Sequence, residues 1–287
     1  MNTNIRNASV MNLEDRVLKW MDLGEVPYSE TFDIQTKLYN MKREGEVSED
    51  FLLSVQHPTE INFGSNEKDN LFSDKLTYQI GEVVGKNPED VTDEEVEQAL
   101  EEMNVRFSKT SRGGGATVLA PGQFVYHPIV DVDPIVEGGL TYDDMTGIGD
   151  YKNMIDEIMK EVLEDLGVEG LKTVKTGYNE VIERERRDVW LEEGSRAYKL
   201  GSKGVVVKQG ISYNGFSLYV HEEGVESFDL IKPCGYSHSD LSVSSVEHET
   251  GERFEKETVD SLIEDKVREK FRYDTVDKVD ITDTTYV

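Results

Sequence analysis

Residues from about 150 to 166 carry the clearest helical pattern in the chain. Their apolar side chains recur at the i, i+3, i+4 spacing that marks one face of a helix: Tyr151, Met154, Ile155, Ile158, Met159, Val162, Leu163 and Leu166. Gly167 follows, and glycine commonly stands just beyond the end of a helix. An apolar face of this width must be buried, so we expect the helix to pack against a sheet.

The rest of the chain alternates between helical and extended patterns. Further helices are predicted at about 29–43, 88–104 and 258–271. Strands are predicted at 51–55, 204–208 and 216–220. Thr92 is the expected N-cap of the second helix, and the last two strands are expected to form a hairpin. This order, without a shift in composition, predicts one α/β (α+β) domain with a mixed sheet flanked by helices.

Acidic side chains outnumber basic ones along the whole chain. Its 287 residues include 59 Asp and Glu against 31 Lys and Arg, a formal charge of −28. The one compact basic group, Arg184, Arg186 and Arg187, is interleaved with acidic residues. A nucleic-acid partner is therefore not expected, because phosphate contacts need clustered Lys and Arg. The even spread of acid resembles proteins of salt-loving organisms and predicts a fold that needs salt.

The chain offers no apolar run of about 18 residues that could cross a bilayer, and its first twenty residues are too charged for an export signal. We expect a cytoplasmic protein without a membrane partner. Its single cysteine excludes an internal disulfide.

Cys234 is a candidate nucleophile. It lies between Pro233 and Gly235, which favour an exposed loop that could aim the side chain; the alternative is a small packing residue under a turn. A thiol needs a partner that favours the thiolate. The candidate partners are a desolvated lysine or one of the five histidines, His57, His127, His221, His238 and His248. The pattern alone does not select among them.

Residues 111–117 contain three consecutive glycines after Arg112. Such a loop can bring backbone amides against a ligand, with the guanidinium as a further donor. Neither a Walker pattern nor a strand, GxGxxG and helix context surrounds it, so a nucleotide site is not supported. A plain tight turn is the alternative.

Taken in order, these segments resemble the lipoyl(octanoyl) transferases, the lipoate-protein ligase B family. The similar segments are RGGGATVLAPGQ at 112–123, KLGSKGV at 199–205, NGFSLYV at 214–220 and FDLIKPCG at 228–235. Gln35, FLL at 51–53 and QHPT at 56–59 agree as well. The resemblance spans about 25–250 and is interrupted by an acidic insertion near 80–108. It leaves an N-terminal segment at 1–24 and a C-terminal helix and tail at 251–287.

The resemblance implies the fold of the catalytic domains of biotin and lipoate protein ligases. It implies transfer of an octanoyl group from acyl carrier protein, or another octanoyl thioester donor, to a lysine of a lipoyl domain. The acceptors would be the E2 subunits of 2-oxoacid dehydrogenases and the H protein of glycine cleavage. No cofactor or metal would be needed.

The resemblance also assigns site residues. Cys234 would be the nucleophile and Lys199 the residue that activates it. The acyl site would be lined by Arg112, Gly113, Gly114, Gly115, Ala116, Thr117, Val118, Leu119, Ser202, Lys203, Gly204, Gly215, Phe216 and Ser217.

Four positions depart from the family pattern. Leu119 and Asn214 replace histidines, Tyr219 replaces an asparagine, and His127 replaces a tyrosine. Two alternatives therefore stand beside a working acyltransferase: a homologue that binds a lipoyl domain or an acyl chain without turnover, and an ATP-dependent lipoate ligase of the same fold.

Overall fold

A computed structural model describes residues 16–63, 72, 74–109, 117–136, 147–173, 188–193, 196–231 and 241–280. Over these residues, nine strands form one sheet in the order β14-β1-β2-β6-β12-β9-β8-β7, with β13 paired to β9. The strands are β1 (Val17–Glu25), β2 (Asp50–Gln56), β6 (Gln123–Ile129), β7 (Leu171–Lys172), β8 (Val189–Glu193), β9 (Arg196–Lys203), β12 (Phe216–Tyr219), β13 (Leu241–Val243) and β14 (Thr275–Lys278). β1 runs parallel to β2 and β14, and β13 runs parallel to β9, whereas the other pairs are antiparallel. The predicted mixed sheet is confirmed.

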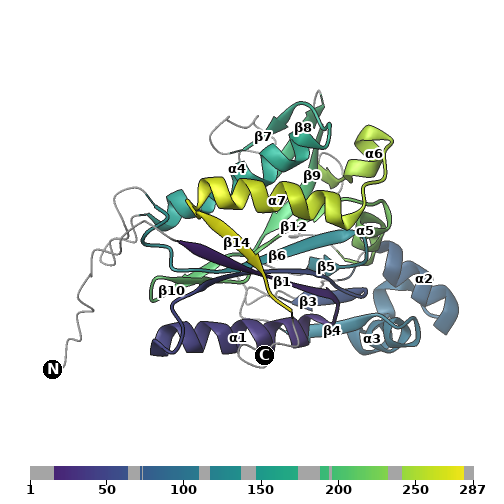
Figure 1. Ribbon diagram of the computed structural model, residues 1–287. Helices are drawn as coiled ribbons and strands as arrows, with labels where there is room; N and C mark the ends of the chain where they lie inside the picture. The colour runs from purple at the N-terminus through teal and green to yellow at the C-terminus, as the bar shows by residue number, and fades with distance from the viewer. Residues whose placement is uncertain are drawn as a thin grey trace.

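Helices cover both faces of this sheet (Figure 1). α4 (Ile148–Asp165) and α7 (Lys256–Lys270) lie on one face, and α1 (Tyr28–Glu44) lies on the other. All three helices were predicted from their apolar spacing. Gly45 and Gly167 follow α1 and α4 with φ of +78° and +96°, the left-handed conformation that ends a helix.

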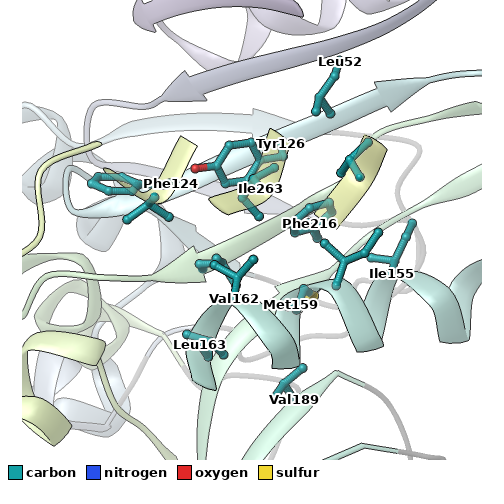
Figure 2. Packing of buried hydrophobic residues seen from close by; sticks show 14 of the residues in the cluster. Leu52, Phe124, Tyr126, Ile155, Met159, Val162, Leu163, Val189, Phe216 and Ile263 are labelled. Carbon is teal, nitrogen blue, oxygen red and sulfur yellow. The ribbon is translucent and has the colours of Figure 1, made fainter. Parts of the chain in front are cut away.

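The apolar face of α4 forms the main core. Ile155, Met159 and Val162 are fully buried and lie toward Tyr126 and Phe216 of the sheet (Figure 2). Each large apolar side chain buried in this way contributes about 1.5–3 kcal/mol. The apolar face predicted at 150–166 thus lies at the center of the fold.

The chain also forms a smaller sheet. It contains β3 (Glu60–Phe63), β4 (Arg106–Lys109) and β5 (Thr117–Leu119) in the order β4-β3-β5. Between β3 and β4 the chain forms α2 (Asp74–Val84), the 3-10 turn η1 (Pro88–Asp90) and α3 (Asp93–Glu102). Thr92 caps α3 in a capping box with Glu95, as expected. The predicted helix at 88–104 is therefore divided into η1 and α3.

The predicted hairpin of 204–208 with 216–220 is wrong. β10 (Val206–Lys208) pairs with β11 (Ile211–Tyr213), and β12 pairs with β6 and β9. The two residues between β10 and β11, Gln209 and Gly210, both have positive φ, as a two-residue hairpin turn with the right twist requires. This turn closes a hairpin before the chain reaches β12.

The remaining short elements follow β12. They are α5 (Glu223–Glu226), the 3-10 turn η2 (Ser227–Leu230) and α6 (Val246–Thr250). Among the described residues, no helix is long and apolar enough to cross a membrane.

Candidate active site

Two segments of the predicted acyl site lie side by side in the main sheet. β9 carries Ser202 and β12 carries Ser217, and these two residues are direct partners in the antiparallel register. Beyond them, the amide of Gly204 donates a hydrogen bond of 2.7 Å to the carbonyl of Gly215. The structure therefore brings together two motifs that are about a dozen residues apart in the chain.

Lys199 lies on β9 at the edge of this arrangement. Its Nζ is 2.7 Å from Oδ2 of Asp188 and 5.8 Å from the ring center of Trp190, and its side chain is 16% exposed. The carbonyl of Lys199 accepts a hydrogen bond of 3.0 Å from the amide of Ser244. An ammonium in this place is paired, backed by an aromatic face and still reachable from solvent.

The side chain of Lys203 is turned toward α4. Its Nζ lies 2.5 Å from Oδ1 of Asp156 and donates to the carbonyl of Lys152. Burial raises the pKa of Asp156 to about 6, against the opposing effect of the Lys203 ammonium. The ammonium of Lys203 is thus occupied by α4. If Lys203 contributes to an acyl site, it does so through its backbone.

Two glycines of the predicted motifs are required by close backbone contacts. A Cβ on Gly215 would lie 1.7 Å from the carbonyl oxygen of Tyr126. Gly122 has φ of +88°, and a Cβ there would lie 2.9 Å from the Cβ of His221. The neighboring Gln123 is buried and donates from Nε2 to the carbonyls of Val118 and Gly224. These residues fix the corner between β5 and β6.

A buried polar cluster lies between α1 and the main sheet. It consists of Thr31, Gln35, His57, His127 and Asn214, all at most 4% exposed. The ring centers of His57 and His127 are 6.4 Å apart, and the backbone amide of Asn214 donates to Oε1 of Gln35 over 2.8 Å. Within the described chain, each member has at least one buried side-chain nitrogen or oxygen without a hydrogen-bond partner. Sequence reasoning weighed His57 and His127 singly and did not find the cluster.

Burial lowers the pKa of His57 to about 4 and that of His127 to about 3. Both imidazoles are therefore neutral at pH 7. Nδ1 of His57 is hydrogen-bonded to the carbonyl of Val26 over 2.7 Å, whereas neither ring nitrogen of His127 has a hydrogen-bond partner among the described residues. Neither ring carries a charge that could stabilize a thiolate.

Of the four positions that depart from the family pattern, His127 and Asn214 belong to this cluster. Asn214 accepts a hydrogen bond from the hydroxyl of Tyr28 and has φ of +53°, which asparagine tolerates. Leu119 is opposite Glu60 in the smaller sheet, and the carboxylate of Glu60 accepts the amide of Tyr28. Leu119 is thus linked to the cluster through Glu60 and Tyr28, whose hydroxyl contacts Asn214.

Tyr219, another departure from the family pattern, forms a polar contact between β12 and β9. Its hydroxyl is 2.5 Å from Oγ of Ser202, across β12 and β9. This bond holds the Ser202 hydroxyl in place.

The acidic insertion packs against the segment that leads to the cysteine. Its helices contribute to an apolar cluster that also contains Tyr219, Phe228 and Ile231. Its other members are Ile61, Phe72, Leu76, Ile80, Val96, Leu100, Val105 and Val118. Phe72 also forms a β-bridge with Ile231. The insertion is thus joined to the site's framework rather than detached from it.

Several predicted residues lie outside the described part of the chain. These are Arg112, Gly113, Gly114, Gly115 and Ala116, the basic group at 184–187, Cys234 and His238. Among the described residues, no three His, Cys, Asp or Glu side chains form a group that could hold a metal ion.

This fold is that of lipoate protein ligases. The bi-partite lipoate protein ligase of Thermoplasma acidophilum is similar with a TM-score of 0.58 at 13% identity, over 94% of this chain and 88% of that one. A lipoate-protein ligase A bound with ATP is similar with a TM-score of 0.56 at 13% identity, over 94% and 90%.

The sequence defines the family more closely. Residues 82–268 match the lipoyl protein ligase A/B catalytic domain, and the chain belongs to this family. Octanoyltransferases are among its relatives. That of Koribacter versatilis is 29% identical over 252 residues, covering 86% of this chain and 81% of the relative. That of Alkaliphilus metalliredigens is 24% identical over 263 residues, covering 92% and 99%.

Proposed function

We propose that this protein transfers an octanoyl group from the thioester of acyl carrier protein to a lysine of lipoyl domains. The observation that carries the proposal is the meeting of β9 and β12, with Lys199 beside them, in a chain whose relatives are octanoyltransferases over most of its length. The acceptor class is supported by the similar archaeal protein, which is described with its E2 lipoyl domain.

The reaction proceeds through an acyl-cysteine at Cys234. The thiolate attacks the thioester carbonyl, the new C–S bond forms, and the bond to the phosphopantetheine sulfur breaks. The departing thiolate takes up a proton. This exchange of one thioester for another is nearly isoenergetic and needs no ATP.

In the second step, the acceptor lysine attacks the acyl-cysteine as a neutral amine. The C–N bond forms, the C–S bond to Cys234 breaks, and the proton lost by the amine passes to the released sulfur of Cys234. Lys199, as a cation, would favor the Cys234 thiolate in both steps, because a nearby positive charge lowers the pKa of a thiol.

The test is octanoyl transfer to an isolated lipoyl domain, followed by intact mass, with octanoyl acyl carrier protein as donor and without ATP. The expected result is one octanoyl group on the lipoyl domain. A parallel reaction supplies free octanoate with ATP. Transfer only in the ATP reaction would establish the ligase alternative, and transfer in neither would establish the binding alternative.

A further inference from the structure

Asp188 is a buried carboxylate that belongs to none of the sequence motifs. It lies directly before β8, is 7% exposed and has both oxygens engaged. Oδ2 lies 2.7 Å from Nζ of Lys199, and Oδ1 accepts the amide of Lys203 over 2.7 Å. The second bond ties the carboxylate to the backbone of β9, so it is held at a fixed place relative to Lys199.

The backbone of Asp188 supports a specific role for its side chain. Its φ is +70°, in the left-handed region that few residues other than glycine adopt, although aspartate and asparagine tolerate it. A register shift between Val189 and Trp190 follows immediately. A register shift of this kind changes the direction in which a neighboring side chain points. Here the result is a carboxylate directed at Lys199.

Among the described residues, two lysines of β9 form ion pairs with buried carboxylates. Lys199 is paired with Asp188, and Lys203 is paired with Asp156 of α4. Asp156 is also influenced by the negative charges of Asp188 and Glu157. Lys203 has its own buried carboxylate in Asp156, whereas the carboxylate of Asp188 lies against the ammonium of Lys199.

We propose that Asp188 is a positioning residue that holds Lys199 as an oriented ammonium. The proposal rests on the proposed function for the role of Lys199 and extends it: Lys199 would assist as a cation and not by removing the thiol proton. Asp188 does not contact the reacting atoms in this scheme.

Two substitutions test the charge of Asp188 without straining the backbone. Asp188→Asn preserves size, and Asp188→Gly suits the positive φ. Asp260→Asn is the matched control, because Asp260 is equally buried at 7% exposure and is paired with Lys256 at 2.6 Å, away from β9.

The measurement is the titration of Lys199 by NMR in the full-length protein after ¹³C reductive methylation, with Lys199→Arg used to assign the signal. Both Asp188 variants should lower the pKa of Lys199 by about 1 unit or more, the scale for losing an adjacent opposite charge. Asp260→Asn should leave it unchanged. A Lys199 pKa that is the same in wild type and both Asp188 variants would overturn the proposal.

The pH profile of octanoyl transfer gives a second result. If the ammonium form assists, the alkaline limb should move to lower pH in both Asp188 variants by the shift measured for Lys199. An unmoved limb would refute the link to catalysis. If the wild-type protein transfers no octanoyl group, the proposed function is refuted. The titration then still tests, independently, whether Asp188 holds Lys199 as an ammonium.

Discussion

Replacing Gly215 with alanine should force apart the strands that carry the candidate site. The added Cβ would lie 1.7 Å from the carbonyl oxygen of Tyr126, 2.7 Å from its carbonyl carbon and 2.9 Å from the Cα of His127, where ordinary contact begins at 3.4 Å. All three are backbone atoms, so no side-chain rotation relieves the clash. The strands themselves must move.

The cost follows from what that movement breaks. Overpacking a core costs about 1–3 kcal/mol. Separation also weakens the bond from the amide of Gly204 to the carbonyl of Gly215 and the pairing of Phe216 with Tyr126, at about 1 kcal/mol for each hydrogen bond. We expect Gly215→Ala to lower the free energy of unfolding by about 3–5 kcal/mol, a large part of the ~5–15 kcal/mol typical of a folded protein.

Urea unfolding followed by tryptophan fluorescence measures this change, since Trp20 and Trp190 are both buried. Gly149→Ala is the matched control: Gly149 lies in α4, and a Cβ there meets nothing within 4 Å. The control should be stabilized by up to about 1 kcal/mol. A Gly215→Ala protein within about 1 kcal/mol of wild type, below the usual cost of overpacking, would refute the reasoning.

Three further predictions address the site, the buried histidines and the charge. Lys199→Ala should lower octanoyl transfer on the order of 10²-fold or more in a steady-state assay, while a wild-type rate would remove Lys199 from the mechanism. His57 and His127 have folded pKa values of about 4 and about 3, below the ordinary 6.5, so their contribution to stability is complete above pH 6.5 and is lost as the pH falls toward these values. At pH 5, His127→Gln should therefore recover roughly 2 kcal/mol relative to its own effect at pH 7, as measured by urea unfolding at both pH values; an equal effect at both would contradict the burial argument. With a net charge of −28, the melting temperature should rise between low and molar salt, because the Debye length falls from about 30 Å at 0.01 M to about 3 Å at 1 M; a constant value would exclude a salt-dependent fold.

Local sequence signals predicted the three longest described helices, α1, α4 and α7, but not α2. The apolar spacing at 150–166 and at 258–271 gave α4 and α7, and Thr92 with Glu95 marked the start of α3. These signals act within one or two helical turns, so they can be recognized without knowing the fold.

Contacts between distant segments could not be predicted in the same way. The partner of β12 depends on the whole sheet, and the early turn at Gln209 and Gly210 changed the expected hairpin. Asp188 stands in a run of mixed charges that gave no reason to single it out. The left-handed backbone of Asp188 and the register shift within β8 bring its carboxylate to Lys199, 11 residues further along the chain.

The buried polar cluster shows the same limit. Its members come from α1, the residue after β2, β6 and the residue after β11, and no local pattern links them. The family resemblance marked Asn214 and His127 as departures, whereas the structure places both in one buried group with His57 and Gln35.

The central claim is that Cys234 carries the acyl group. The most direct measurement is intact mass of the protein after incubation with octanoyl acyl carrier protein and no acceptor, for wild type and Cys234→Ser. Wild type should gain one octanoyl group, with peptide mapping placing it on Cys234, and the serine variant should gain no stable acyl group while unfolding in urea like wild type. An unmodified wild-type protein that nevertheless transfers octanoyl to a lipoyl domain, or a serine variant that transfers at the wild-type rate, would contradict the acyl-cysteine mechanism.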